Sequence, residues 1–526
     1  MKKKFIKCVS LMLSLALLIT CVAGCGKEKT ISTNTGTGEY PEKLTIFAKI
    51  GANALKAGAQ DRNDTLPFKM IEKATGCHVE WINPSPTAFG EQFNLLLASG
   101  KYPDIIQSSW GGKTADLKLL IEDGVILPIQ DYLEHMPNLS KFIEENPEIR
   151  RQILSSDGKL IYAPGLRLDE ELKIFVGPEI RYDWLEKLGL EVPKTLDEFY
   201  NVLMAFKTGD PNGNGEADEI PFTGIGADSS TSWAIGNIAW AFNTHYGFYI
   251  KDGKVTHGML ENEMKDALKY INKLYMDGLI DQDFLINDRD KIDNKILNDK
   301  AGFAFGVQPS LYAASMDDGV RKFAAIPYIN GICLNPTYRS NLVNNECVIT
   351  SACSNPSGAA KWLDFFYGEE GIEYTNFGEE GVSFEKVDGK NQFIDSYISN
   401  NPNGKGQIEM IALATLLTTT DFAMLQTWEG YSQTLLPWGK ESIEMWTDTA
   451  EYSNALPPLM FTEEESKEIS RLYPDMKTYI SEIFCNMIIG RTDISEFDNI
   501  RNQLEKMNIS RVIEIYNQAY ERYMNN

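Results

Sequence analysis

Residues on which metal-dependent and nucleophilic enzymes rely are scarce in this sequence. Only four of the 526 residues are histidine, and none of them forms an HExxH motif or another closely spaced ligand pair. Neither the GxSxG motif of serine hydrolases nor a P-loop occurs. A glycoside hydrolase needs two facing carboxylates, but among 74 acidic residues a pair such as Glu369-Glu370 arises by chance. We therefore expect a protein that is not an enzyme.

Closely paired cysteines are missing as well. The sequence has eight cysteines but no CxxC, the spacing typical of zinc sites. Three of the eight lie within the first 25 residues, and the other five follow no motif. We interpret these five as small buried hydrophobic residues, and one disulfide among them stays open.

Basic residues are outnumbered, with 50 Lys and Arg against 74 Asp and Glu, and the formal net charge is -24. A nucleic-acid-binding surface needs a dominant basic footprint, and so does electrostatic adhesion to anionic lipid. The composition therefore argues against both partners. Hydrophobic residues make up 43% and aromatic residues 11% of the chain, which is too much for a mostly disordered protein.

Beyond the first 25 residues the sequence has no long apolar run, and none of its apolar runs approaches the roughly 18 residues of a membrane-spanning helix. The start itself reads as a secretory signal, with four lysines before an apolar stretch that ends in Val22-Ala23-Gly24-Cys25. That ending resembles the bacterial lipobox. We predict a signal peptide over 1–24, a lipidated Cys25, and a flexible tether over 25–42. Cleavage would remove four Lys and no acid, which takes the net charge from -24 to -28.

The remaining chain alternates between strand and helix patterns. A β-rich strand is predicted over 44–50, and helical apolar spacing covers 358–367 and 495–507. Thr195 followed by Glu198 predicts a capping box at the start of a helix. Alternating elements of this kind predict α/β architecture.

Several runs occur in an order that resembles the family 1 bacterial extracellular solute-binding proteins of ABC importers. Within that family the chain is most similar to the long LplA-type lipoproteins and the alginate-binding proteins. Each run is weak alone, but together they span most of the chain behind the lipobox. The matching runs are Tyr102-Pro-Asp-Ile-Ile106, Gly158–Gly165, Ile180–Leu190, Asp277-Gly-Leu-Ile280, Lys300–Gly306, Asn355–Tyr367, Gly378-Glu-Glu-Gly381 and Val387-Asp-Gly389.

The resemblance implies an α/β, two-lobe periplasmic-binding-protein-like fold with a hinge and an inter-lobe ligand cleft that closes around the ligand. The chain would cross the hinge near 166–174, 339–346 and 440–455. Lobe 1 then comprises 43–168 and 345–450. Lobe 2 comprises 169–344 and 451–526.

The segment 210–219 is the sharpest local motif and predicts a structural calcium site. Oxygen-bearing side chains stand at loop positions 1, 3, 5, 9 and 10, and Gly215 stands at position 6, where the EF-hand turn needs glycine. Pro221 replaces the usual bidentate Glu, so Asp218 and Glu219 would supply that charge. The alternative is a metal-free surface turn. The predicted ligands are Asp210, Asn212, Asn214, Asp218, Glu219 and the backbone carbonyl of Glu216.

Aromatic residues near strand ends are the candidates for ligand contact. Sugar sites combine aromatic platforms with a few polar groups, and ligands of open α/β folds lie beyond the carboxyl ends of strands. Trp184, Trp240 and Trp362 are expected in the core instead. The predicted ligand residues are Ser108, Ser109, Trp110, Tyr162, Trp233, Gln308, Tyr312, Trp428 and Trp438.

We therefore predict a monomeric, lipid-anchored protein on the outer face of the bacterial cytoplasmic membrane. It would bind an oligosaccharide by lobe closure and deliver it to an ABC permease. Two alternatives stay open on the same fold, namely a binder of peptide or another small solute, and a sensor that presents its ligand to a receptor. A lipoprotein glycoside hydrolase is the weakest alternative.

Overall fold

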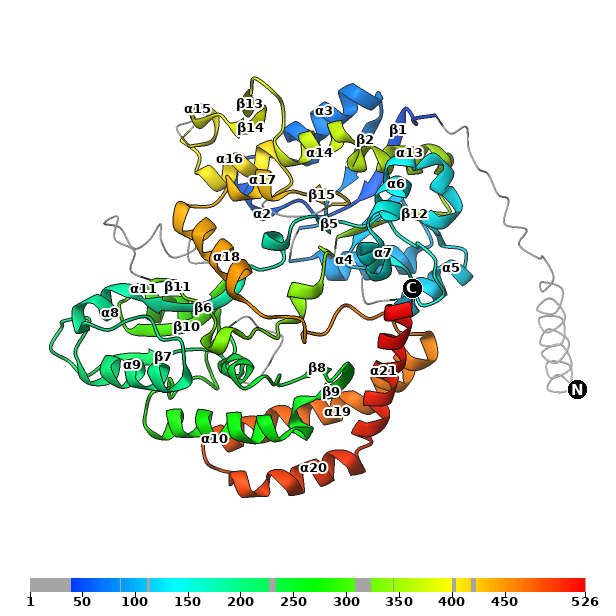
Figure 1. Ribbon diagram of the computed structural model, residues 1–526. Helices are drawn as coiled ribbons and strands as arrows, with labels where there is room; N and C mark the ends of the chain where they lie inside the picture. Colours follow the sequence, from blue (N-terminus) through cyan, green and yellow to red (C-terminus); the bar gives the residue numbers. More distant parts are fainter. Residues whose placement is uncertain are drawn as a thin grey trace, which may run out of the picture. The chain divides into compact units, whose positions relative to one another are not determined.

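The structure is a computed structural model that describes residues 39–525 except 86, 111–113, 227–232, 308–322, 344, 400–403 and 418–421. The chain separates into two compact units, residues 1–35 and 36–526, and every described residue belongs to the second. Two separate β-sheets, each covered by helices, form the framework of this second unit (Figure 1). The predicted Cys25 lies outside the described residues.

Lobe 1 is built on a five-stranded sheet with the order β2-β1-β3-β12-β4. β1 is parallel to β2 and β3, whereas β12 enters antiparallel between β3 and β4. Helix α3 (Leu66–Thr75) connects β1 to β2 and ends at Gly76, whose φ of 69° suits a left-handed C-cap. The strands are β1 (Lys43–Phe47), β2 (His78–Ile82), β3 (Ile105–Ser108), β4 (Ile126–Leu127) and β12 (Glu346–Thr350).

The central strands β3 and β12 of the lobe 1 sheet are buried along their whole length. Ile46, Ile105 and Ile349 are fully buried in one core cluster with Trp362 of α13 (Pro356–Asp364). A smaller cluster on the sheet contains Phe47, Ile106 and Val348. Near-continuous burial of this kind is typical of strands covered on both sides. Burial of Trp362 confirms the prediction for that residue.

Lobe 2 is built on a four-stranded sheet with the order β11-β6-β10-β7. Its centre is aromatic: the rings of Phe199, Phe222 and Phe303 meet edge to face at centroid distances of 4.7 to 6.0 Å. Trp184 and Trp240 are buried in the same core, as predicted. The strands are β6 (Val176–Arg181), β7 (Ile220–Phe222), β10 (Ala301–Val307) and β11 (Phe323–Ala325). The main helices are α8 (Tyr182–Leu188), α9 (Leu196–Thr208), α10 (Asn262–Met276) and α11 (Arg289–Leu297).

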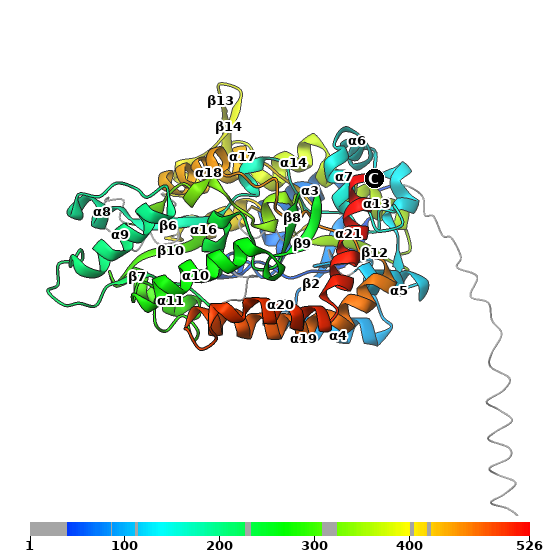
Figure 2. The same cartoon turned by 60° about the horizontal axis from the view of Figure 1, so that its bottom comes forward.

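From Glu463 on the chain forms three helices that pack on lobe 2. They are α19 (Glu463–Ile488), α20 (Phe497–Lys506) and α21 (Ile509–Asn525). Figure 2 shows α19 and α20 along one side and α21 rising from them toward the C-terminus. Phe484, Phe497 and Val512 are fully buried in the lobe 2 core. The predicted capping box of Thr195 and Glu198 and the predicted helix within 495–507 are both confirmed. None of the described helices is both long and apolar enough to cross a membrane.

The two lobes are joined by a short ribbon in which β5 (Leu166–Arg167) runs parallel to β15 (Leu425–Gln426). Leu342 bridges to Leu166, so three distant segments of the chain meet at this ribbon. Downstream of β15, α18 (Pro437–Thr449) packs on lobe 2, where the Trp446 indole donates to the Ile326 carbonyl at 2.9 Å. Trp446 is buried in the same core cluster as Ile180 and Phe303 of the lobe 2 sheet.

Candidate functional site

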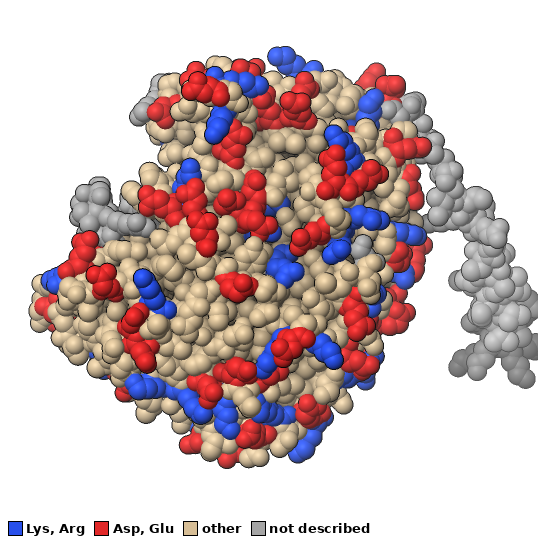
Figure 3. Space-filling view, in the orientation of Figure 1, with Lys and Arg blue, Asp and Glu red and all other residues tan. Residues whose placement is uncertain are grey.

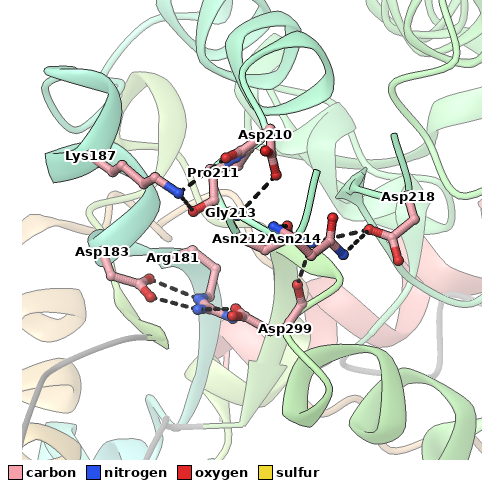
Figure 4. A network of polar contacts seen from close by, with 10 residues as sticks. All are labelled: Arg181, Asp183, Lys187, Asp210, Pro211, Asn212, Gly213, Asn214, Asp218 and Asp299. Carbon is pink, nitrogen blue, oxygen red and sulfur yellow. Dashed lines mark hydrogen bonds and ion pairs between the residues drawn. The ribbon is translucent and has the colours of Figure 1, made fainter. Parts of the chain in front are cut away.

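The segment 210–219 forms a tight polar loop between α9 and β7 (Figure 4). Asp210, Gly213 and Gly215 have φ angles of 46°, 76° and 77°. This left-handed backbone is what the two glycines allow without steric cost. The Asp210 carboxylate accepts hydrogen bonds from the Gly213 and Gly215 amides at 2.9 and 3.2 Å, which fixes the turn.

Asp218 is the electrostatic centre of the loop. Its carboxylate accepts hydrogen bonds from the Asn212 and Asn214 amides at 3.1 and 3.0 Å and pairs with Lys300 at 2.8 Å. The Lys300 bond first, and then the two amide bonds, lower the pKa of Asp218 to about 2. Asp218 is therefore a full negative charge at neutral pH.

Glu219 is a loop carboxylate with one unsatisfied oxygen, while backbone amides of Asn212 and of Glu219 itself hydrogen-bond to the carboxylate. Its Oε1 atom is buried and accepts no hydrogen bond. Burial, and then repulsion from Asp210 and Asp218, raise the pKa of Glu219. Asp210, Asp218 and Glu219 bring carboxylates to one short loop that also holds the Lys300 ammonium, and hard oxygen ligands of this kind suit Ca²⁺. Among the described residues no group of three or more His, Cys, Asp or Glu is placed to hold a metal ion, and the loop side chains hydrogen-bond to one another.

The residues predicted at the end of β3 are divided between core and surface. Ser108 is buried and Ser109 is exposed. The Trp110 ring is only 1% exposed and meets Phe93 edge to face at 5.3 Å. Its backbone amide donates to the buried Glu346 carboxylate at 2.8 Å. Trp110 can touch a ligand only if its neighbours move.

Tyr162 lies in the same lobe 1 cluster as Trp110. Its hydroxyl is buried and has no hydrogen-bond partner, and burial followed by the charge of Glu346 raises its pKa. An unmade hydrogen bond of this kind is costly and calls for a reason.

Trp233 is partly buried on lobe 2, in the cluster that includes α11. The Arg289 guanidinium lies 4.0 Å from its ring centroid, which is a cation–π distance, and the indole nitrogen is buried without an acceptor. The other two lobe 2 candidates, Gln308 and Tyr312, lie outside the described residues.

Trp428 and Trp438 stand next to the ribbon that joins the lobes. Trp428 begins α17 (Trp428–Ser432), and its backbone amide donates to the Asp169 carboxylate at 2.6 Å. The rings of Trp428 and Tyr431 are 6.2 Å apart, and both residues are partly exposed. Trp438 in α18 is also partly exposed, although its indole nitrogen is buried without an acceptor. These rings offer accessible apolar surface of the kind that sugar faces contact.

Arg167 is a feature of this region that the sequence patterns did not indicate. It lies on β5, its guanidinium carbon is 5.1 Å from the Phe175 ring centroid, and Tyr431 is close enough to interact electrostatically. Within the described part of the chain its guanidinium makes no hydrogen bond or ion pair. Burial lowers the pKa of Arg167, and Tyr431 opposes part of that shift. Its position at the predicted first crossing was the only available signal.

Comparison with known proteins decides the family. A family model described as bacterial extracellular solute-binding protein matches residues 51–373, which is more than half of the chain. The chain belongs to this family. This solute-binding protein shares its two-lobe α/β fold with solved sugar-binding relatives, so the predicted family and fold are confirmed.

One relative of this solute-binding protein matches nearly its full length, and another matches about three quarters of it. It is 29% identical over 544 residues to the fructooligosaccharide ABC transporter substrate-binding protein FusA of Streptococcus pneumoniae, with 98% of each chain covered. It is 28% identical over 393 residues to lipoprotein LipO of Bacillus subtilis, with 72% of this chain and 74% of the relative covered.

Solved structures of FusA match this solute-binding protein as well. FusA in complex with kestose superposes with a TM-score of 0.71 at 27% identity, and the match covers 92% of this chain and 100% of that chain. A FusA EF-hand mutant in complex with fructo-nystose matches with the same TM-score at 26% identity and the same coverage. These relatives are substrate-binding proteins, which fits the prediction that the chain is not an enzyme.

Proposed function

We propose that this chain is the substrate-binding protein of an ABC importer and that it binds an oligosaccharide between its two lobes. The end-to-end similarity to FusA, over 98% of both chains, carries the proposal. The partly exposed rings of Trp428, Tyr431 and Trp438 beside the lobe-joining ribbon support it, because they supply the apolar platform of a sugar site. Of the residues predicted from sequence, these two tryptophans are the best placed for contact.

A thermal-shift and calorimetric panel tests this function. It contains 1-kestose, nystose, trigalacturonate and mixed tripeptides. We expect a member of the sugar set to raise the Tm and to titrate with a Kd in the micromolar range or below, about -8 kcal/mol or stronger. Stabilisation by peptides alone would replace the carbohydrate proposal with the peptide-binding alternative.

We also propose that 210–219 binds a structural Ca²⁺ through Asp210, Asn212, Asn214, Asp218, Glu219 and the Glu216 carbonyl. The orphaned, buried Glu219 oxygen supports this, since a cation would give it a partner. The existence of an EF-hand mutant of FusA points the same way. Its role would be stability, because the loop contains no nucleophile and no base.

Calorimetry with and without chelator tests the calcium site, with one matched pair of variants. Glu219→Gln should weaken calcium binding at least about tenfold, because it removes a ligating charge. Glu216→Gln is the control, since only its backbone carbonyl is proposed to bind and its side chain is exposed. Calcium at 100 times its Kd should add about 2.7 kcal/mol of stability. Equal behaviour of both variants would remove the site from the proposal.

Finally, we propose that Cys25 carries the lipid that anchors the protein to the outer face of the membrane. The lipobox-like Val22-Ala23-Gly24-Cys25 supports this, and the relative LipO is named a lipoprotein. Cys25→Ser should move the protein from the membrane fraction to the medium. A wild-type protein that mass spectrometry finds unlipidated would contradict the anchor. Delivery to a permease, and a monomeric state, complete the proposed picture.

A further inference from the structure

The ribbon that joins the lobes contains a cation with an unusual environment. At Arg167 the backbone amide donates to the Asn341 carbonyl at 2.8 Å, and the Asn341 side chain donates back to the Arg167 carbonyl at 2.7 Å. On its other side β5 pairs with β15. Strand segments from all three chain passages therefore hold the Arg167 backbone in one place, while the guanidinium stays outside this network.

No carboxylate of the described chain neutralises Arg167. The nearest acids along the sequence are already engaged: Asp169 accepts from the Trp428 amide, and Glu170 pairs with Lys173 at 2.6 Å and accepts from the Tyr452 hydroxyl at 2.8 Å. The guanidinium instead lies among aromatic rings, over Phe175 and close to Tyr431. A partly desolvated arginine without a partner is costly, and a ligand that satisfies its donors would recover that cost.

We propose that the Arg167 guanidinium is the hinge-side hydrogen-bond donor of the ligand site and holds two adjacent hydroxyl oxygens of an uncharged sugar ring. Arginine presents its donors in a planar fork, which matches two neighbouring oxygens at once. Phe175 and Tyr431 lie near the guanidinium and the Trp428 ring lies 6.2 Å from that of Tyr431, so these rings supply apolar surface for the sugar face. This inference rests on the proposed function and names the class of its ligand.

The surrounding charge favours a neutral ligand over an acidic one. Asp169, Glu170 and Glu171 follow Arg167 after Leu168, and Glu429 is exposed on α17 next to Trp428. In Figure 3, acidic side chains also gather over the region that Figure 1 labels α18. An oligosaccharide of uronic acids would place its carboxylates among these acids and find one unpaired arginine, whereas neutral hydroxyls meet no such repulsion.

Titration of the purified chain with 1-kestose, nystose and trigalacturonate tests this inference. Arg167→Met should weaken binding of the neutral sugars roughly 10- to 100-fold, as expected for the loss of hydrogen bonds from a charged donor. Arg167→Lys should recover only a part, because an ammonium cannot form the planar fork. Arg471→Met, an arginine on the exposed surface of α19, is the matched control and should bind like wild type.

The Tm of each ligand-free variant shows that it is folded. If Arg167→Met is unstable, Arg167→Lys serves as the test variant, because it keeps the positive charge. Neutral binding should change less than about threefold between 50 and 500 mM salt, since screening affects only charged pairs. Wild-type-like binding by Arg167→Met, or tighter wild-type binding of trigalacturonate than of neutral sugars, overturns this inference and leaves the proposed function intact. If the wild type binds no sugar of the panel, both fall together.

Discussion

Two arginines close in sequence, Arg181 in lobe 2 and Arg167 at the ribbon, differ in how they are neutralised. Arg181 is 1% exposed and donates to Asp183 at 2.8 and 2.6 Å, and it also pairs with Asp299. Each guanidinium lies over an aromatic ring at 5.1 Å, Trp184 for Arg181 and Phe175 for Arg167. Of these two arginines, only Arg181 has carboxylate partners among the described residues. The difference separates a cation that builds the fold from one that is available to a ligand.

Removal of the paired arginine is the largest expected effect. Arg181→Ala would leave Asp183 and Asp299 without their cation and would empty space beside Trp184. A broken buried pair costs about 3–5 kcal/mol, but Asp183 and Asp299 reach solvent, so we expect about 2–3 kcal/mol of lost stability. Urea denaturation of the ligand-free chain measures it. A loss below about 0.5 kcal/mol, as for an exposed arginine such as Arg471, would erase the distinction between the two sites.

Strand β6, which ends at Arg181, packs closely against α18. A methyl group on Gly177 would lie 2.4 Å from the Trp446 ring. The ring is held in place because its indole nitrogen donates a hydrogen bond to the Ile326 carbonyl. Gly177→Ala should therefore cost about 1–3 kcal/mol. Gly90→Ala is the control, because nothing lies within 4 Å of the added methyl and its helix favours alanine. Equal stability of both variants would place α18 outside lobe 2.

Glu179, on the same strand as Arg181, is a buried acid whose carboxylate oxygens make no hydrogen bond. It is fully buried, neither carboxylate oxygen has a hydrogen-bond partner, and its carboxylate lies beside Gly306. Burial raises the pKa of Glu179 well above its usual value; Arg289 opposes this shift and Asp293 adds to it.

The sign of the pH effect follows from that shift. Below the unfolded pKa of about 4.5 both states carry the proton, and as the pH rises the unfolded state ionises first, which costs the wild type stability. Glu179→Gln should therefore be more stable than wild type by on the order of 1 kcal/mol at pH 8 and similar to it at pH 4. Unfolding curves at both pH values measure this. An equal difference at both values would contradict an ionising, unpaired Glu179.

Arg167→Met is expected to have the smallest effect on the ligand-free protein. The substitution leaves no described carboxylate without its cation, so the free energy of unfolding of the variant should stay within about 0.5 kcal/mol of that of the wild type. Urea denaturation beside Arg181→Ala gives the contrast directly. A loss comparable to that of Arg181→Ala would make Arg167 a structural cation.

Local patterns in the sequence predicted local structure well. The capping box of Thr195 and Glu198 needs only a three-residue spacing, and the loop at 210–219 needs only ten residues, so both can be read from the chain. Trp110 shows the limit of such patterns: its place after a strand was visible, but its burial depends on the ring of Phe93 and on the bond of its backbone amide to Glu346.

Contacts between distant segments could not be foreseen. α18 joined lobe 2 because Trp446 fits over Gly177, a match of shapes that no spacing encodes. Arg167 owes its environment to Phe175 on one side and to Tyr431, far along the chain, on the other. The absence of a carboxylate partner, which makes it a candidate, emerges only once the chain is folded.

The insertion of β12 between β3 and β4 has a consequence for the order of folding. Every strand of the lobe 2 sheet precedes residue 326, whereas the lobe 1 sheet is incomplete until residues 346–350 are available. During synthesis, which starts at the N-terminus, lobe 2 can therefore complete its sheet before lobe 1 does. The β5–β15 ribbon can form only after both sheets are available, since β15 waits for residue 426. Non-local pairings of this kind form slowly, so the junction between the lobes should gain protection from hydrogen exchange later than either sheet during refolding.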